Sequence, residues 1–249
     1  MIKYDLHTHT SFSDGKNTPE EMLAYAETNG IDVLGISDHE YAPMQTSYCI
    51  GKNNTKNYVD TINKLKEKAK IKLYLGTERD YFSLESEFNY DYVIGSVHSI
   101  LKNGEYIDVD HSAEMMEKNV SRLYNGNYLD YVKDYYALVK KIAEKTKCDI
   151  VGHFDLVCKF NQSNKYFDEN SDEYKMIALD AAQTIADKCE FVEINTGAMH
   201  RGYRTRQYPD SFLIDYFKSR NVRLILASDS HSTKTLCYQF ENMKKYIDK

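Results

Sequence analysis

Several features that mark other classes of protein are missing from this chain of 249 residues. No apolar run approaches the ~20 residues that a membrane-spanning helix needs. The N-terminus carries no apolar stretch ahead of a small-residue cleavage site, so we expect no secretory signal and a cytoplasmic location. Basic residues are not in surplus. The formal net charge is −6, whereas a nucleic-acid surface would show a basic patch or stripe. The composition therefore excludes a membrane protein and argues against a nucleic-acid partner.

The chain also lacks paired cysteines. Its five cysteines, at positions 49, 148, 158, 189 and 237, form no C-x-x-C motif. Their odd number fits reduced, structural thiols in a cytosol, and we assign none of them to a metal. No linker, low-complexity tract or repeat of fixed period interrupts the sequence, so we expect one domain over residues 1–249.

What the chain does contain is a regular alternation of strand and helix patterns. Apolar or β-branched runs predict seven strands, one just before His7 and the others at 33–37, 71–76, 92–96, 149–152, 191–194 and 222–227. Amphipathic patterns predict helices at 18–30, 58–70, 128–146, 172–188, 211–220 and 235–247. This rhythm indicates parallel strands joined by crossover helices.

Two stretches break the alternation. Residues 99–127 show no convincing strand, and residues 154–171 are polar and aromatic. Both follow a predicted strand. We therefore interpret them as loop insertions that contain short helices.

Nearly every predicted strand ends in a residue that can bind a metal ion. The set is His7, His9, Asp14, His39, Glu78, His98, His153, Asp229 and His231. In an open, doubly wound sheet the site gathers at one switch point, but here ligands follow almost every strand. This pattern favours a closed barrel, whose active site lies at the carboxyl ends of the strands.

The donor types restrict the metal. Imidazole and carboxylate without thiolate suit Zn, Mn or Fe. Nine ligands are too many for one tetrahedral ion and suit two or three. Glu78 is the natural bridge, because a carboxylate offers two oxygens and this one stands alone on the third strand.

The motifs resemble those of the PHP family, named after polymerase and histidinol phosphatase. The matching segments are H-T-H-T at 7–10, S-D-G at 13–15, S-D-H at 37–39, P-M at 43–44, G-T-E at 76–78, D-Y at 80–81, D-Y-V-I-G-S-V-H at 91–98, G-H-F-D-L at 152–156, E-I-N-T-G at 193–197 and A-S-D-S-H at 227–231. The segments at 91–98 and 193–196 resemble stand-alone histidinol-phosphate phosphatases more than polymerase-attached domains. The resemblance implies a distorted (β/α)7 TIM-like barrel with a trinuclear metal site.

The resemblance also implies how the ligands divide. One ion would take His7, His9, Glu78 and Asp229, a second Glu78, His98 and His153, and a third Asp14, His39 and His231. Some members carry a histidine where this chain has Asp14, and a carboxylate there shifts the preference toward Mn or Fe.

The implied reaction is hydrolysis of a phosphate monoester, most of all L-histidinol phosphate in histidine biosynthesis. A hydroxide that bridges the first two metals would attack phosphorus. Glu78, Asp229 and His231 are the expected catalytic residues. Asp229 or His231 would relay a proton to the leaving alkoxide.

Substrate contacts are expected from the segment 199–206, which holds three arginines after the sixth strand. Arg201 and Arg204 are the first candidates for a phosphate clamp, since guanidinium groups bind phosphate in a bidentate manner. Asn195 is expected to orient a neighbouring group or the substrate. His200 is expected nearer to substrate than His111. Candidate acceptors for a charged alcohol are Asp80, Glu40 and residues of the two insertion loops.

Three other functions remain open at this point. A phosphoesterase for nucleotides or oligonucleotides would need a basic groove, and the insertion at 99–127 is not basic. A phosphotyrosine phosphatase would need a site open to a protein side chain. A non-catalytic metal-binding module would show a missing ligand, and all nine are present.

Overall fold

The computed structural model describes residues 3–45, 47–84 and 86–247. Its central sheet has seven parallel strands in the order β1-β2-β3-β4-β7-β8-β9. The strands are β1 (Tyr4–Asp5), β2 (Val33–Ile36), β3 (Lys72–Asp80), β4 (Tyr92–Ser96), β7 (Ile150–Val151), β8 (Phe191–Asn195) and β9 (Arg223–Ala227). The predicted seven parallel strands are confirmed.

The sheet curls until its first and last strands meet. Beyond β1 and β9, Thr8 and Ser230 form a parallel bridge, and the His9 amide donates to the Ser230 carbonyl at 2.8 Å. The result is a nearly closed, distorted (β/α)7 TIM-like barrel, as predicted.

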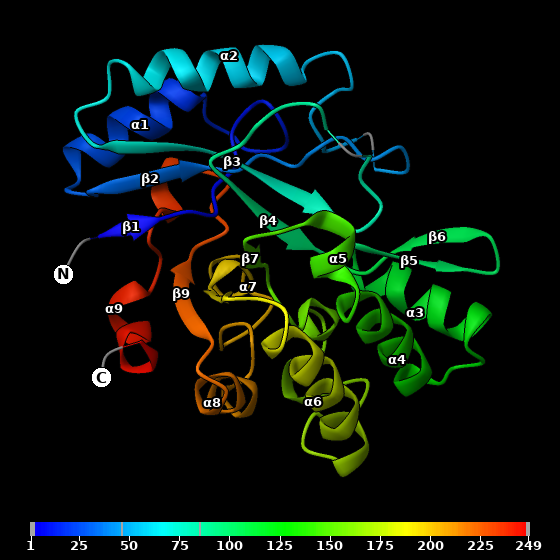
Figure 1. Cartoon of the computed structure of the whole chain (residues 1–249). Helices are drawn as coiled ribbons and strands as arrows, with labels where there is room; N and C mark the ends of the chain where they lie inside the picture. Colours follow the sequence, from blue (N-terminus) through cyan, green and yellow to red (C-terminus); the bar gives the residue numbers. More distant parts are fainter. Residues whose placement is uncertain (1–2, 46, 85, 248–249) are drawn as a thin grey trace.

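Helices surround the barrel (Figure 1). They are α1 (Pro19–Thr28), α2 (Thr55–Lys66), α3 (Ala113–Leu123), α4 (Tyr128–Val139), α5 (Ile142–Thr146), α6 (Asp172–Ala186), α7 (Gly197–His200), α8 (Ser211–Ser219) and α9 (Phe240–Met243). Short 3-10 turns lie at Leu156–Cys158, Gln162–Asn164, Thr233–Thr235 and Lys244–Tyr246. The capping box at Thr18 and Glu21 forms as the sequence predicts. No helix within the described residues is long and apolar enough to cross a lipid bilayer.

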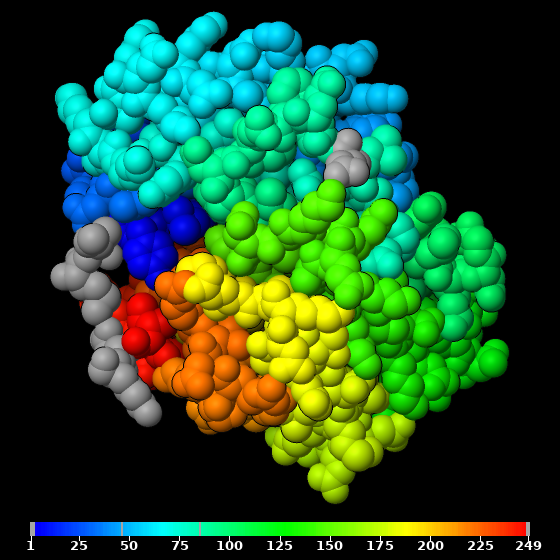
Figure 2. All heavy atoms as spheres, viewed as in Figure 1, coloured from blue at the N-terminus to red at the C-terminus, as the bar shows by residue number. Residues whose placement is uncertain are grey.

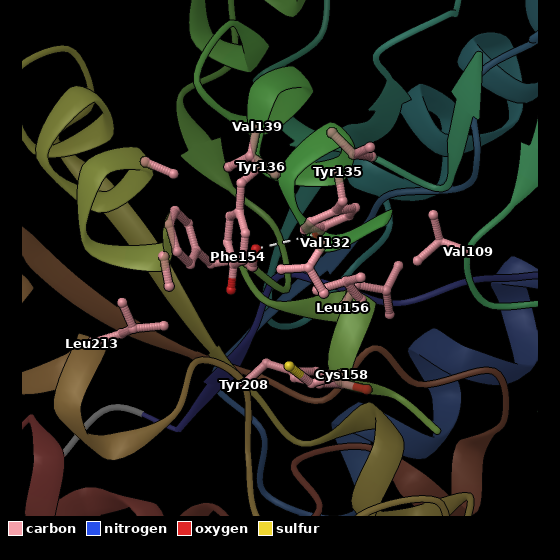
Figure 3. Packing of buried hydrophobic residues seen from close by; sticks show 14 of the residues in the cluster. Val109, Val132, Tyr135, Tyr136, Val139, Phe154, Leu156, Cys158, Tyr208 and Leu213 are labelled. Atoms are coloured by element: carbon pink, nitrogen blue, oxygen red, sulfur yellow. Dashed lines mark hydrogen bonds between the residues drawn. The ribbon is translucent and has the colours of Figure 1, made fainter. Parts of the chain in front are cut away.

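The largest apolar cluster packs α4 and α6 against the barrel around β7 and β8. Val132, Tyr135 and Tyr136 project from α4 toward Phe154, which follows β7 (Figure 3). The Tyr135 hydroxyl donates to the Phe154 carbonyl at 3.2 Å, so this core also fixes the chain just after His153.

Residues 99–127 differ from the prediction, because they contain a β-hairpin. Strands β5 (Ser99–Lys102) and β6 (Glu105–Asp108) pair antiparallel across a turn in which Asn103 and Gly104 have φ of 51° and 84°. Asn-Gly is the characteristic signal of such a turn, and this signal was overlooked. The hairpin projects from the barrel at the right of Figures 1 and 2.

Two predicted helices are interrupted. The helix expected at 128–146 ends at Val139, and α5 begins at Ile142. Of the helix expected at 235–247, only α9 and the 3-10 turn at Lys244–Tyr246 form, since Cys237 and Gln239 adopt left-handed φ of 55° and 59°. The Cys237 amide donates to the buried carboxylate of Asp5 at 2.8 Å. This tertiary contact outweighs the local helical pattern.

Candidate metal centre

The nine predicted ligands converge at the carboxyl ends of the barrel strands. They form four overlapping groups in which the potential ligand atoms lie within 4.8 Å of one another. The groups are His9, Asp14, His39 and His231; His7, His153 and Asp229; His7, His9 and Glu78; and His39, Glu78 and His98. Ligands from separate strands therefore share one site.

Glu78 occupies the middle of this site. Five imidazoles lie within 3.5 Å of its carboxylate: His39 at 2.9 Å, His153 at 3.0 Å, His7 and His98 at 3.3 Å, and His9 at 3.5 Å. His98 and His153 face its Oε1, whereas His7, His9 and His39 face its Oε2. Two oxygens with separate sets of imidazoles suit a bridging carboxylate.

Asp229 and Asp14 flank this centre. Asp229 Oδ1 lies 3.3 Å from His9 Nε2. Asp14 Oδ2 lies 3.1 Å from His231 Nε2, and its other oxygen lies 3.7 Å from His39 Nε2. His9 and His39 therefore link the acidic groups to the carboxylate of Glu78.

The donor set fits bound cations better than hydrogen bonding within the protein. His7 Nε2, both ring nitrogens of His9 and Glu78 Oε2 are buried without a hydrogen-bond partner among the described residues. Buried polar atoms normally find a partner, so lone pairs left open in one place indicate a ligand for them. Imidazole nitrogens and carboxylate oxygens suit Zn, Mn or Fe.

The electrostatics hold His9 and Glu78 in the protonation states that bind metals, whereas nearby carboxylates outweigh burial and raise the pKa of His7, His39 and His98, which release their protons when a metal binds. Burial, together with His231 and His39, lowers the pKa of His9 to about 3, so its imidazole is neutral near pH 7. Burial alone would raise the pKa of Glu78, but His7 and His39 outweigh it and hold that pKa well below its usual value. Glu78 is therefore a carboxylate, which accepts a metal.

A second layer of side chains orients the imidazoles. Glu193 Oε2 lies 2.8 Å from His7 Nδ1, while its Oε1 accepts the His153 amide and, at 2.7 Å, the Asn195 side chain. Asp80 Oδ2 lies 3.2 Å from His98 Nδ1. Such partners fix the ring orientation of metal-binding histidines. These roles were missed, although Glu193 stands two residues before Asn195 on a buried strand and so shares its face.

Asp229 is held in an uncommon backbone conformation, with φ of 51°. Gly197 makes room for it, because a Cβ on Gly197 would lie 2.6 Å from Asp229 Oδ2. Left-handed conformations of non-glycine residues cluster at functional sites.

A cavity of about 260 Å³ opens onto this centre. It is lined by Asp14, His39, Tyr48, Glu78, His98, Asp108, Asp110, His111, His153, Leu156, Lys159, Arg201, Asp229 and His231. We use the term outer wall for four of them, Asp108, Asp110, His111 and Lys159. The outer wall comes from the end of β6, the segment that follows it, and the 154–171 insertion.

The PHP domain model matches residues 5–197. The chain belongs to the PHP family. Curated relatives include proteins of Schizosaccharomyces pombe and Deinococcus radiodurans, each named a probable histidinol-phosphatase. The first is 27% identical over 77% of this chain and 65% of its own length, and the second 26% over 98% and 92%. The chain thus spans just under two thirds of the first relative and most of the second.

Solved structures share the PHP barrel. A Listeria monocytogenes protein superposes with a TM-score of 0.80 at 20% identity, over 96% of this chain and 99% of its own. The histidinol phosphate phosphatase of Lactococcus lactis, complexed with Zn, L-histidinol and phosphate, superposes with a TM-score of 0.70 at 22% identity, over 98% and 94%.

Some of the residues expected to contact substrate line the cavity, and others do not. Arg201 lines it, and its guanidinium contacts Asp229 Oδ1 at 3.1 Å and His231 Nδ1 at 2.8 Å. Arg204 is buried instead against Glu169, at 2.7 and 2.9 Å, and also donates to the Cys158 carbonyl. Its place in the clamp is therefore corrected: Arg204 anchors the 154–171 insertion.

The contacts of Asn195 agree with its expected role, whereas the places of the two remaining histidines differ from the prediction. The Asn195 side chain donates a hydrogen bond to Glu193 Oε1 and accepts one from the Gly197 amide, which fits an orienting role. His200 packs against Tyr238 and is not among the lining residues, whereas His111 is. His111, rather than His200, therefore lies at the cavity.

The two acceptors suggested for a charged alcohol do not belong to the cavity. Asp80 is engaged with His98, and Glu40 pairs with Arg79. The insertion loops, the third candidate, do supply the outer wall, but the sequence does not show that a hairpin brings Asp108 and Asp110 to the cavity.

Proposed function

We propose that this protein is a metal-dependent phosphate monoester hydrolase, namely a histidinol-phosphate phosphatase of histidine biosynthesis. The convergence of nine metal-binding side chains in one site, seven of which line the cavity, carries this proposal. The names of the relatives and the contents of the Lactococcus lactis structure support it.

The side chains present can hold up to three divalent ions. Glu78 would be shared, with His7, His9 and Asp229 on one side and His98 and His153 on the other. Asp14, His39 and His231 would hold the third. Zinc in the Lactococcus lactis structure makes zinc the first candidate, and Asp14 keeps Mn and Fe suitable. Divalent ions, when bound, supply positive charge that activates water and neutralises phosphoryl oxygens.

Protein groups supply the remaining chemistry. Arg201 presents its guanidinium beside Asp229 at the cavity surface and would hold a phosphoryl oxygen. Asp229 or His231 would carry a proton to the departing alcohol. Lys159 contributes a second cation, although Asp110 Oδ2 lies only 3.2 Å from its Nζ.

The outer wall favours a positively charged alcohol. Lys159 compensates Asp110, but within the described residues Asp108 has no lysine or arginine in ion-pair distance and accepts only from the Ser99 hydroxyl, at 2.9 Å. L-histidinol carries an ammonium group and an imidazole. Both groups can donate hydrogen bonds to a carboxylate that has no cation beside it.

A substrate panel tests the proposal. Purified protein is assayed with L-histidinol phosphate, sugar phosphates, nucleotides and phosphotyrosine, with Zn, Mn or Fe supplied in turn. We expect kcat/KM for L-histidinol phosphate to exceed that for every other ester. Preference for a nucleotide or phosphotyrosine would reassign the substrate, and inactivity on all esters would refute the proposal.

A further inference from the structure

Tyr48 lies at the inner edge of the cavity, on the loop between β2 and α2. Its ring stands edge-on to His39, with centroids 4.9 Å apart, and to His98 at 6.3 Å. These two histidines form one group of potential metal ligands together with Glu78, and His39 also belongs to a second group. Tyr48 therefore sits where the metal centre meets the rest of the cavity.

The hydroxyl of Tyr48 is buried and has no hydrogen-bond partner in the part of the chain that the structure describes. Other buried tyrosines are bonded: the Tyr58 hydroxyl donates to the Ile36 and Gly76 carbonyls, and Tyr135 to Phe154. The hydroxyls of Tyr131 and Tyr208 also lack a partner among the described residues, but these two tyrosines do not line the cavity. An unpaired hydroxyl at a cavity surface is placed to bond what enters the cavity.

Tyr48 is suited to donate a hydrogen bond. The ordinary pKa of a tyrosine is about 10, so the phenol keeps its proton at neutral pH. A phenol of this kind donates to an oxygen that gains negative charge.

The layout of the cavity selects that oxygen. The phosphoryl group belongs with the metal ligands and Arg201, and the alcohol belongs with the outer wall. The ester oxygen joins the two. Tyr48 stands beside His39 and His98 on the metal side, and Asp108 and Asp110 act on it from the outer wall.

We propose that the Tyr48 hydroxyl donates a hydrogen bond to the ester oxygen of the bound phosphate monoester. This inference rests on the proposed function. During hydrolysis the oxygen of water bonds to phosphorus and gives up a proton to Asp229 or His231, while the ester P–O bond breaks with its electron pair passing to the alcohol oxygen. That oxygen finally takes a proton from Asp229 or His231. Tyr48 stabilises its negative charge and keeps its own proton.

The test compares two leaving groups in Tyr48→Phe. An alkyl ester such as L-histidinol phosphate leaves as a strongly basic alkoxide, whereas 4-nitrophenyl phosphate leaves as a stable phenolate. We expect kcat/KM for the alkyl ester to fall about 10-fold or more, as for other donors to developing charge, and that for the aryl ester to stay within about 2-fold. Inhibition by inorganic phosphate should not change, because phosphate has no ester oxygen.

Controls separate this role from a structural one. Tyr131→Phe removes another open, buried hydroxyl outside the cavity and should leave both esters unchanged. Metal content and thermal unfolding of Tyr48→Phe should match those of the original protein.

Several results would overturn the inference. Equal losses for both esters, or weaker inhibition by phosphate, would place the hydroxyl on the phosphoryl oxygens. Loss of metal would make Tyr48 a support for His39, and unchanged rates for both esters would remove it from the reaction. Inactivity of the original protein on every ester would refute the proposed function itself, and this inference with it.

Discussion

Glu78 holds the centre of the site because β3 is long. The strand runs from Lys72 to Asp80, and residue 78 pairs through a bridge with His39 on the neighbouring chain segment. Its carboxylate is thus fixed among five imidazoles that arrive from other strands. An amide of the same shape would keep the fold but offer only one oxygen to metal.

Glu78→Gln should therefore abolish phosphatase activity and lower metal content while leaving the protein folded. The measurement is the phosphatase rate, with metal analysis and circular dichroism beside it. Glu241→Gln, an exposed glutamate paired with Lys244, is the control. Activity near the original level in Glu78→Gln would refute the bridging role.

Glu193 illustrates a second kind of residue, one that acts through its neighbours. Glu193→Gln keeps the size of the side chain but removes the charge beside His7 Nδ1. Changes of this kind typically weaken metal affinity about 10- to 100-fold. We expect a loss of that order in a chelator competition titration. Glu190→Gln, an exposed neighbour, should bind metal normally, and equal affinities for all three proteins would contradict the role.

Arg201 combines a charge with direct access to the cavity. Arg201→Ala should reduce kcat/KM for phosphate esters about 10- to 100-fold, the range expected for a lost hydrogen bond to a charged group. Steady-state kinetics measure this change. Arg220→Ala, which removes an exposed arginine paired with Asp187, serves as the control. Unchanged kinetics would exclude Arg201 from phosphate binding.

At the scale of elements, the barrel strands and the places of the two insertions were predicted, but the hairpin inside the first insertion was not. Buried parallel strands show as apolar runs, and each ligand follows such a run directly. The hairpin β5–β6 depends on an Asn-Gly turn within a polar segment, and its position over the cavity depends on tertiary packing. The break near Cys237 depends on Asp5, which is far away in the sequence. Local patterns carry no information on such contacts.

The pair Arg204–Glu169 shows how an insertion is attached to the barrel. Both side chains are buried, and the pair joins the 154–171 insertion to the loop after α7. Removing one member of a buried ion pair costs about 3–5 kcal/mol where the partner is left alone. Arg206 also contacts Glu169, at 2.6 Å, so the loss of Arg204 should cost an amount at the lower end of this range.

Arg204→Met should lower the free energy of unfolding by about 3 kcal/mol, measured by urea denaturation, with little change in KM for the folded enzyme. Asp187→Asn, which breaks an exposed pair with Arg220, should cost about 1 kcal/mol or less. Unchanged stability together with a raised KM would return Arg204 to the phosphate clamp.

For the whole molecule, a closed parallel barrel explains why residues 7 to 231 meet. The parallel strands end at the same face of the barrel, so a ligand placed directly after a strand lies at that face. The positions of the nine side chains relative to the predicted strands were therefore enough to predict that they share a site. The cavity wall could not be predicted in this way. Tyr48 and Lys159 reach it from loops and Asp108 from the β5–β6 hairpin, and the paths of these segments depend on packing rather than on the direction of the barrel strands.

The most direct test of this account measures metal content and phosphatase activity together in the same samples. Chelation should remove about three equivalents of divalent metal per chain and abolish hydrolysis of L-histidinol phosphate, and adding back Zn, Mn or Fe should restore both. A chelated protein that contains no metal yet hydrolyses the ester at the original rate would contradict the account.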